Sequence, residues 1–280
     1  MAVDLHTHSS YSDGTARPEE VVAAAVGRGL TALALTDHDT LDGIAEAGRA
    51  AEDAGLPFVP GVELSVGWNA RAVHLLAYWI EPGPGPLQDR LAEIQQGREA
   101  RNVQIVEALD ALGFDITMEE IRAIAGDGVV GRPHFAVALM QRNAVASISE
   151  AFDRYLAKGR PAYRPRKRLS AAEAVALARR SGGVTSVAHP HTVADDASAF
   201  EAAFSGFAAL GITGVECYYV EYAPETRRKL VSIARNAGLV PTGGSDYHGG
   251  NKPGIEVGIG RGDLVVPDEV LGELAAARPV

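Results

Sequence analysis

Short apolar segments that run directly into histidine or acidic side chains recur along this chain, and they constrain its fold more than any other feature. Residues 30–35 lead into His38, and residues 184–188 end at His189. Stretches with helical periodicity, such as residues 41–54, separate these segments. This alternation predicts a parallel β/α sheet or barrel, in which the chemistry collects at the carboxyl ends of the strands.

The segment HTHSSYSDG at residues 6–14 follows the first apolar strand. His6 and His8 are two residues apart, so on a strand both imidazoles leave from the same face and can bind one metal ion. Asp13 adds a carboxylate from the Ser/Gly-rich turn. Such a pair also occurs by chance on surface strands, so its interpretation depends on the other histidines of the chain.

The composition bounds the class of protein. A chain of 280 residues with 46% hydrophobic residues suffices for one large barrel-type domain, or for a domain with an insertion. The net charge of −10 argues against a general nucleic-acid coat protein but allows a local phosphate pocket. The single cysteine, Cys217, excludes an internal disulfide framework. Without a leader or an apolar run of bilayer length, we expect a cytoplasmic protein that has no membrane contact, and nothing implies a stable protein partner.

A Pro/Gly-rich segment at residues 82–86 interrupts the strand–helix alternation. Helical periodicity follows at residues 87–112, 133–142 and 147–156. We therefore predict a barrel formed by residues 1–80 and 166–280, with a helical insertion at residues 81–165. Five cationic residues between Arg160 and Arg168 favour a solvated linker, with phosphate steering as the alternative.

Most of the histidines follow a predicted strand. The eight are His6, His8, His38, His74, His134, His189, His191 and His248. His134, within the insertion, is the exception. Asp13, Glu63 and Asp246 accompany them, and Asp37 and Asp39 flank His38. Imidazoles with carboxylates and no cysteine suit manganese, zinc or iron, and so many ligands exceed the needs of one ion. We expect two or three divalent ions, spaced to act on a phosphoryl group.

The motifs HTHSSYSDG, TDHDT, GVELS, VHLLAY, VAHPH and GSDYH, in this order, resemble those of the PHP (polymerase and histidinol phosphatase) superfamily. GRPHFA in the insertion resembles the branch with nucleoside 3′,5′-bisphosphate phosphatases, which also act as 5′-to-3′ exoribonucleases on short RNA. The resemblance implies an α/β fold, a distorted seven-stranded β/α (TIM-like) barrel, with a trinuclear site that commonly holds manganese.

The resemblance also implies individual roles. The expected metal ligands are His6, His8, Asp13, His38, Glu63, His74, His189, Asp246 and His248. We expect Glu63 to bridge two ions, because a carboxylate has two oxygens to share. Asp37, Asp39 and His191 are expected to orient ligand imidazoles through their other ring nitrogen.

Four residues of the insertion are expected to bind substrate phosphate: Arg101, Asn102, Arg132 and His134. Planar guanidinium groups bind phosphate through two parallel hydrogen bonds. Arg98 lies three residues before Arg101, so the two share a helix face, although an ordinary exposed face explains Arg98 equally well.

Together these features predict a metal-dependent phosphatase, in which hydroxide held by the metals attacks phosphorus. Its expected substrate is a nucleoside 3′,5′-bisphosphate, with short 5′-phosphorylated RNA as a related one. Three alternatives stay open: a histidinol-phosphate-type phosphatase, a non-catalytic metal-stabilised module of a polymerase, and an amidohydrolase-like enzyme. The arginines of the insertion favour a doubly phosphorylated substrate over histidinol phosphate. They also favour phosphate chemistry over the hydrolysis of carbon–nitrogen bonds by an amidohydrolase-like enzyme.

Overall fold

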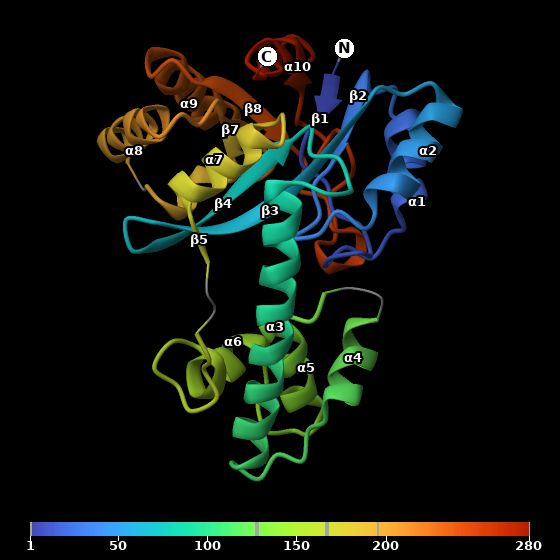
Figure 1. The fold of residues 1–280 in the computed structure, drawn as a ribbon, viewed down its shortest axis with the longest axis vertical. Helices are drawn as coiled ribbons and strands as arrows, with labels where there is room; N and C mark the ends of the chain where they lie inside the picture. Colours follow the sequence, from blue (N-terminus) through green and yellow to red (C-terminus); the bar gives the residue numbers. More distant parts are fainter. Residues whose placement is uncertain (1, 127–128, 166–167, 195, 280) are drawn as a thin grey trace. The chain divides into compact units, whose positions relative to one another are not determined.

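The computed structural model describes residues 2–126, 129–165, 168–194 and 196–279. The chain divides into two compact units: Met1–Leu91 with Arg168–Val280, here the barrel unit, and Ala92–Lys167, here the insertion unit (Figure 1). The second unit was predicted at residues 81–165. The start of the long helix α3 (Pro86–Asp110) belongs to the barrel unit, where the Leu87 amide donates a 3.3 Å hydrogen bond to Ser181 Oγ.

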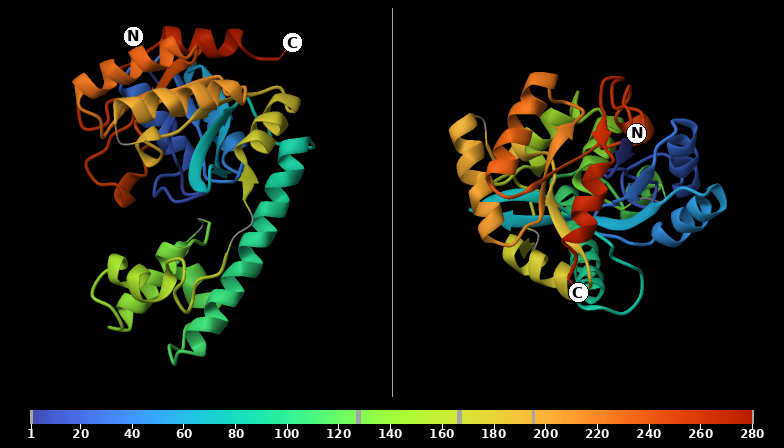
Figure 2. Two further views of the ribbon diagram at one scale, coloured as in Figure 1. Left: turned by 90° about the vertical axis from the view of Figure 1, so that its left-hand side faces the viewer. Right: turned by 90° about the horizontal axis from the view of Figure 1, so that it is seen from above.

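The barrel unit alternates strands with helices along the chain. Its strands are β1 (Ala2–Asp4), β2 (Ala32–Leu35), β3 (Phe58–Trp68), β4 (Arg71–Tyr78), β5 (Leu169–Ser170), β6 (Val184–Val187), β7 (Gly214–Tyr219), β8 (Val240–Gly244) and β9 (Val266–Pro267). Its helices are α1 (Pro18–Gly27), α2 (Ile44–Ala54), α7 (Ala171–Arg180), α8 (Ala197–Ala209), α9 (Pro224–Asn236) and α10 (Glu269–Ala276), with short 3₁₀ turns at Pro190–Thr192 and Gly249–Asn251. Figure 2 shows α1 and α2 on one side of the strands, and α8 and α9 on the other.

All nine strands form one sheet, in the order β8-β7-β6-β4-β3-β2-β1-β9, with β5 paired to β3. β4 runs antiparallel to both of its neighbours. The first strand of this order, β8, also meets β1, the neighbour of the last strand β9: the Leu5 amide donates a 3.2 Å hydrogen bond to Gly243 O and the Asp246 amide a 2.8 Å bond to His6 O. The result is a mixed α/β fold with a nearly closed, barrel-shaped sheet.

The structure has two strands more than the seven predicted. The seven expected strands correspond to β1–β4 and β6–β8, and the additional strands β5 and β9 have two residues each. Two residues are too few to show a period-2 pattern, so these strands are defined by their partners alone. β9 pairs antiparallel with β1, and β5 extends the pairing of β3.

The barrel core includes Val3, Leu76 and Tyr78, and it brings β1 against the rest of the sheet. Tyr78 is fully buried, and its hydroxyl donates a 3.0 Å hydrogen bond to the carbonyl of Leu5. Buried apolar side chains on both faces of the strands are typical of a sheet covered by helices. The core therefore fixes the strand ends from which the expected site residues emerge.

The insertion unit has its own apolar core, which includes Leu109, Phe135 and Leu139. It contains most of α3, α4 (Met118–Ala125), α5 (Arg132–Gln141), α6 (Ile148–Ala151) and a π-helical turn at Phe152–Leu156. The Thr117 hydroxyl caps α4, accepting a 3.2 Å hydrogen bond from the Glu120 amide. The Glu120 carboxylate, however, pairs with Arg142.

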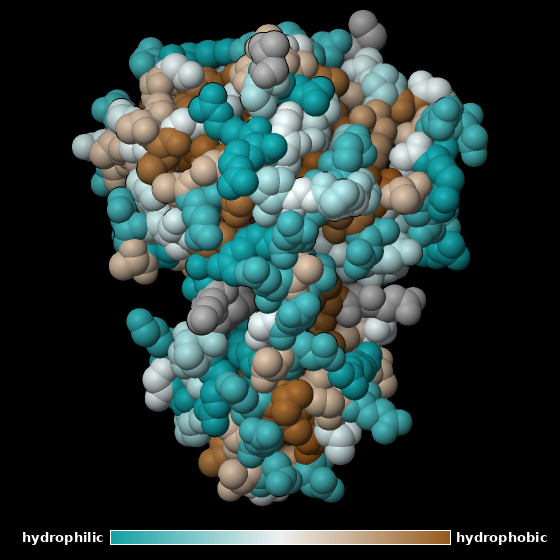
Figure 3. Space-filling model, viewed as in Figure 1, coloured by the Kyte–Doolittle hydropathy of each residue, from teal (hydrophilic) through white to brown (hydrophobic). Residues whose placement is uncertain are grey.

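Hydrophilic side chains dominate the surface in the view of Figure 3, with apolar side chains in separate groups between them. The large apolar side chains that are exposed, such as Val103 and Val265, come from different elements. Among the described helices, none combines the length and the apolar character that a bilayer-spanning segment requires.

Candidate metal centre

The nine predicted ligands all lie in the barrel unit, and the structure brings their side chains together. His6 and His8 follow β1, Asp13 lies in the turn before α1, and His38 follows β2. Glu63 is in β3 and His74 in β4, whereas His189 follows β6, and Asp246 and His248 follow β8.

The first group of ligand atoms surrounds one oxygen of Glu63. Nε2 of His6 and Nε2 of His8 are 3.1 Å apart, and they lie 3.4 and 3.2 Å from Glu63 Oε2. Oδ1 of Asp246 is 3.5 Å from both nitrogens. Two imidazole nitrogens this close would repel each other if both carried a proton, because two N–H donors would then face each other, so at least one of the two lone pairs points into the group.

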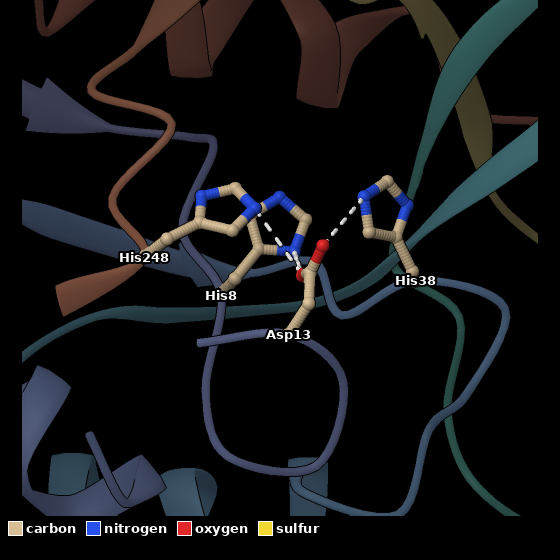
Figure 4. A group of neighbouring side chains, drawn as sticks. All are labelled: His8, Asp13, His38 and His248. Atoms are coloured by element: carbon tan, nitrogen blue, oxygen red, sulfur yellow. Dashed lines mark ion pairs between the residues drawn. The ribbon is translucent and has the colours of Figure 1, made fainter. Parts of the chain in front are cut away.

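The second group centres on Asp13 (Figure 4). Its carboxylate lies between the imidazoles of His8, His38 and His248, which all point toward it. The distances are 3.7 Å to His8 Nδ1, 3.6 Å to His38 Nε2 and 3.2 Å to His248 Nε2. Three imidazoles and one carboxylate from three strand ends therefore converge on one small volume.

The third group uses the other side of Glu63. Oε1 lies 2.9 Å from His74 Nδ1 and 3.1 Å from His189 Nε2, while Oε2 is 3.2 Å from His38 Nδ1. Glu63 is almost fully buried, and its two oxygens face five imidazoles in all. This is the arrangement that a carboxylate shared between ions requires.

The donor set fits divalent metal ions. Three groups hold ligand atoms within 4.8 Å of one another: His8, Asp13, His38 and His248; His6, His8 and Glu63; and His38, Glu63 and His74. His74 Nδ1 is buried without a hydrogen-bond partner although Glu63 Oε1 is 2.9 Å away. Two atoms that bind the same ion lie close together without a hydrogen bond between them, as His74 Nδ1 and Glu63 Oε1 do here. Several ions of the manganese, zinc or iron type suit these groups.

Electrostatics keeps the carboxylates charged. Burial alone would raise the pKa of Glu63, but His38, His74 and His6 lower it well below its usual value. Burial would likewise raise the pKa of Asp246, but His6 and His8 lower it well below its usual value. Burial dominates at His38 and lowers its pKa to about 4, so its nitrogen lone pair is available at neutral pH.

His8 behaves differently in the absence of metal. Burial would lower its pKa, but hydrogen bonds to Asp246 and Glu63 raise it to about 10. Metal ligands must be deprotonated, so an ion entering this group displaces the proton that His8 otherwise holds. Metal binding at the centre is therefore coupled to proton release.

Asp37 and Asp39 each reach an imidazole through a serine. Asp37 accepts hydrogen bonds from the Ser9 amide (2.8 Å) and from Ser12 Oγ (2.5 Å), and Ser12 Oγ is 3.5 Å from His8 Nδ1. Asp39 accepts a 3.2 Å bond from the amide of Ser65, whose hydroxyl is 3.4 Å from His74 Nε2. Asp37 thus holds the segment after β1 that carries His8, and Asp39 holds the part of β3 that pairs with His74.

The remaining residue expected beside the ligands, His191, is exposed. Its Nδ1 lies 3.0 Å from the hydroxyl of Tyr222, and its ring centroid is 5.9 Å from that of His189. His191 therefore lies at the edge of the centre.

Sequence reasoning missed three polar neighbours of the ligands. Glu216 Oε1 lies 3.0 Å from His6 Nδ1. Tyr219 OH donates a 2.8 Å hydrogen bond to Asp246 Oδ2, and Lys252 Nζ is 2.5 Å from the same oxygen. A lone acidic residue inside the apolar segment GVECYY was a signal for Glu216, because buried charges are rare unless paired.

The four predicted substrate-binding residues lie in the insertion unit and contact groups of that unit. Arg101 Nη2 donates a 2.6 Å hydrogen bond to Asn102 Oδ1, and Asn102 Nδ2 donates one of 3.1 Å to Val130 O. His134 Nδ1 accepts a 3.0 Å bond from the Gly131 amide. Arg132 Nη1 donates a 3.2 Å bond to Leu156 O.

Two neighbouring features complete this region. Arg98 and Arg101 are both largely buried on α3, so Arg98 does not lie on an ordinary exposed face. Of the cationic run at residues 160–168, residues 166 and 167 lie outside the described residues, and Arg164 donates hydrogen bonds to Pro161 O and Tyr163 O.

A nearly closed α/β barrel with histidine and carboxylate clusters at its strand ends defines a metal-binding barrel protein. Residues 4–186 match the model of the PHP domain, and the chain belongs to the PHP family. It is 35% identical over 260 residues to the 3′,5′-nucleoside bisphosphate phosphatase of Chromobacterium violaceum, covering 91% of this chain and 90% of that protein.

Two further comparisons agree with this assignment. A 5′-3′ exoribonuclease of Haemophilus influenzae is 32% identical over 245 residues, covering 88% of this chain and 89% of that protein. A crystal structure of a protein of Bifidobacterium adolescentis, described as a candidate metal-dependent phosphoesterase, superposes with a TM-score of 0.81 at 30% identity, covering 99% of this chain and 96% of that one.

Proposed function

We propose that this protein is a metal-dependent phosphoesterase that hydrolyses a phosphate monoester of nucleoside 3′,5′-bisphosphates. The observation that carries the proposal is the convergence of five imidazoles on the two oxygens of Glu63, beside a second imidazole group around Asp13. Relatives that match 91% and 88% of the chain are named a 3′,5′-nucleoside bisphosphate phosphatase and a 5′-3′ exoribonuclease. Short 5′-phosphorylated RNA is the related substrate.

The nine ligands are proposed to hold two or three divalent ions, with manganese as the first choice. When bound, such ions polarise phosphoryl oxygens and lower the pKa of water. The chain itself supplies neutral imidazoles and ionised carboxylates in a buried setting, where their charges are weakly screened. Glu63 contributes negative charge at the centre of the set, and Asp13 does so at its more exposed side.

The second phosphate of the substrate needs cations of the protein, because only one phosphate can lie on the metals. Arg101, Asn102, Arg132 and His134 are the proposed contacts. Arg132 follows Gly131, whose extended backbone begins α5, and guanidinium groups favour bidentate phosphate binding. A histidinol-phosphate-type substrate has one phosphate and would not need these groups.

The deciding experiment compares phosphate release from a panel of substrates by the manganese-loaded full-length chain. The panel contains adenosine 3′,5′-bisphosphate, adenosine 5′-monophosphate, histidinol phosphate, a simple amide, and a 5′-phosphorylated oligoribonucleotide whose mononucleotide products are measured by chromatography. We expect the bisphosphate to be hydrolysed best, and activity to disappear when a chelator removes the metals. Faster hydrolysis of histidinol phosphate would replace the proposed substrate, and amide hydrolysis without phosphate release would replace the proposed chemistry.

Metal content provides the matching test. Elemental analysis after manganese loading and desalting should find two or three ions per chain, and an Asp13→Ala variant should retain fewer. Two or three ions per wild-type chain with no phosphate release would leave a non-catalytic metal-stabilised module as the better description, and fewer than one ion would overturn the proposed metal centre.

A further inference from the structure

Glu216 in β7 is fully buried, and the proposed ligand set does not use it. Its Oε1 lies 3.0 Å from His6 Nδ1, and its Oε2 accepts a 2.7 Å hydrogen bond from the backbone amide of His189. Burying a carboxylate is costly unless hydrogen bonds compensate it. Here each oxygen has its own partner, and each partner belongs to a proposed ligand from a different strand end.

A bulge in β7 allows two side chains of this strand, Glu216 and Tyr219, to contact proposed metal ligands. Residues three apart on a regular strand point to opposite faces, yet both Glu216 and Tyr219 contact proposed ligands. The register with β8 shifts between Glu216 and Tyr218, so Cys217 is the extra residue of a β-bulge, which re-aims the side chains that follow it.

The partner strand is adapted to this bulge. A Cβ atom on Gly243, opposite Tyr218, would lie 2.3 Å from the Tyr218 carbonyl oxygen. On Gly244 it would lie 2.4 Å from the Cβ of His6. The consecutive glycines therefore allow β8 to approach both the bulge and the segment that carries His6.

We propose that Glu216, together with Tyr219 across the bulge, positions the metal ligands. Glu216 accepts a hydrogen bond from the Nδ1–H group of His6, which leaves the Nε2 lone pair directed at the centre, because a neutral imidazole has one donor and one acceptor nitrogen. Tyr219 holds Asp246 Oδ2, so that Oδ1 faces His6 and His8. This inference rests on the proposed metal-dependent function.

Glu216 also holds the backbone of His189. His189 has a φ of +29°, a region that side-chain-bearing residues rarely adopt and that surrounding interactions must stabilise. The short bond from its amide to Glu216 Oε2 is such an interaction. Glu216 thus links the orientation of one ligand ring to the backbone conformation of another ligand.

The requirement for a carboxylate gives a specific test. Glutamine has the same shape but one acceptor oxygen and one donor NH₂ group. If its oxygen accepts from the His189 amide, its NH₂ group faces His6 Nδ1, which can accept only when the ring proton moves to Nε2, the atom that faces the centre. Otherwise the NH₂ group faces the His189 amide, which is itself a donor. Tyr218→Phe, which changes a neighbouring residue of β7 with no ligand contact among the described interactions, is the matched control.

Manganese affinity is measured on the full-length variants by competition with a chelator, and metal content by elemental analysis. For Glu216→Gln we expect manganese binding to be weaker by about 10- to 100-fold, the range for residues that orient metal ligands. For Tyr218→Phe we expect the wild-type affinity. Wild-type affinity and content in Glu216→Gln would overturn the inference, whereas a wild-type chain that binds no metal would overturn the proposed function instead.

Thermal melting of the metal-free proteins separates positioning from folding. The inference holds if Glu216→Gln, kept below its melting temperature, still binds manganese more weakly. A lower melting temperature with unchanged affinity would make Glu216 a structural residue only. If this variant does not fold, Tyr219→Phe tests the same role of β7: we expect a several-fold weaker affinity, and an unchanged affinity overturns the inference.

Discussion

The two units of this protein place their polar residues in different ways. In the barrel unit, ligand atoms from distant strand ends approach one another to between 2.9 and 3.7 Å, without hydrogen-bond geometry at His74. In the insertion unit, Arg101 and Arg132 donate hydrogen bonds to Asn102 and Leu156 of the same unit. The barrel residues converge on a common volume, whereas those of the insertion also stabilise their own helices.

The difference shows how far the backbone of each unit determines where its polar side chains lie. The carboxyl ends of neighbouring parallel strands must meet at one edge of a sheet, so topology alone brings their side chains together. Glu63 and His74 join them from within the antiparallel strands β3 and β4. Three of the residues at these ends, Asp39, His189 and Asp246, have positive φ values of 53°, 29° and 52°. Backbone strain of this kind is typical of functional sites. Helix surfaces impose no comparable convergence.

The largest effect is expected from Glu63→Gln, which tests the convergence in the barrel. Glutamine keeps one of the two oxygens that face the five imidazoles, and it lacks the negative charge that attracts divalent ions to the group. Activity on the bisphosphate should fall by more than about 100-fold, beyond the range for residues that merely orient ligands, and manganese content should fall with it. Kinetics and elemental analysis measure both effects.

The matched control for this change is Glu52→Gln on the exposed face of α2. It should leave both quantities unchanged. Retention of wild-type metal content by Glu63→Gln would mean that the imidazole groups bind ions without their central carboxylate.

The difference between strand ends and helix surfaces also explains which parts of the fold and of the site could be predicted from the sequence. The seven main strands, the positions of His6 and His38 after strands and that of Glu63 within one could be predicted, because apolar runs and their polar ends are local signals. The strands β5 and β9, and the bulge at Cys217, depend on pairing with distant residues and leave no such signal. Glu216 was overlooked because its partners, His6 and the His189 amide, are set by that pairing.

A smaller effect is expected from Arg132→Ala, which tests the insertion unit. If this arginine binds the non-reacting phosphate, catalytic efficiency on adenosine 3′,5′-bisphosphate should fall about 10- to 150-fold, equivalent to about 1.5–3 kcal/mol for hydrogen bonds to a charged group. Efficiency on a monophosphate should change little. Steady-state kinetics on both substrates measures the ratio.

The structure requires a control for packing, because the Arg132 guanidinium also lies 5.5 Å from the ring centroid of Phe152 and 5.7 Å from that of Tyr163. Arg154→Ala removes a similar contact with Tyr155 in the same unit and should leave both efficiencies unchanged. Equal losses on both substrates in Arg132→Ala would assign the arginine to the reacting phosphate. No loss on either would make the residue structural and remove the support for a bisphosphate substrate.

The smallest effect is expected from Glu120→Gln, which asks whether polar contacts at the surface of the insertion unit stabilise it appreciably. Arg142 Nη2 donates a 2.7 Å hydrogen bond to Glu120 Oε2, and both side chains are between a quarter and a third exposed. Pairs of this kind contribute about 1 kcal/mol or less. The variant should lower the free energy of unfolding by no more than that, and leave metal content and activity unchanged.

The pH dependence of this contribution has a definite sign. The hydrogen bond from Arg142 lowers the pKa of Glu120, so the stabilisation is present above the usual glutamate pKa and is lost as the pH falls through the lowered value. Hydrogen exchange of amides in α4 and α5 at neutral and at acidic pH measures it, with the exposed neighbour Glu119→Gln as control. A loss well above 1 kcal/mol at neutral pH, or any loss of metal, would contradict the view that the insertion unit is held mainly by its apolar core while the barrel carries the charged centre.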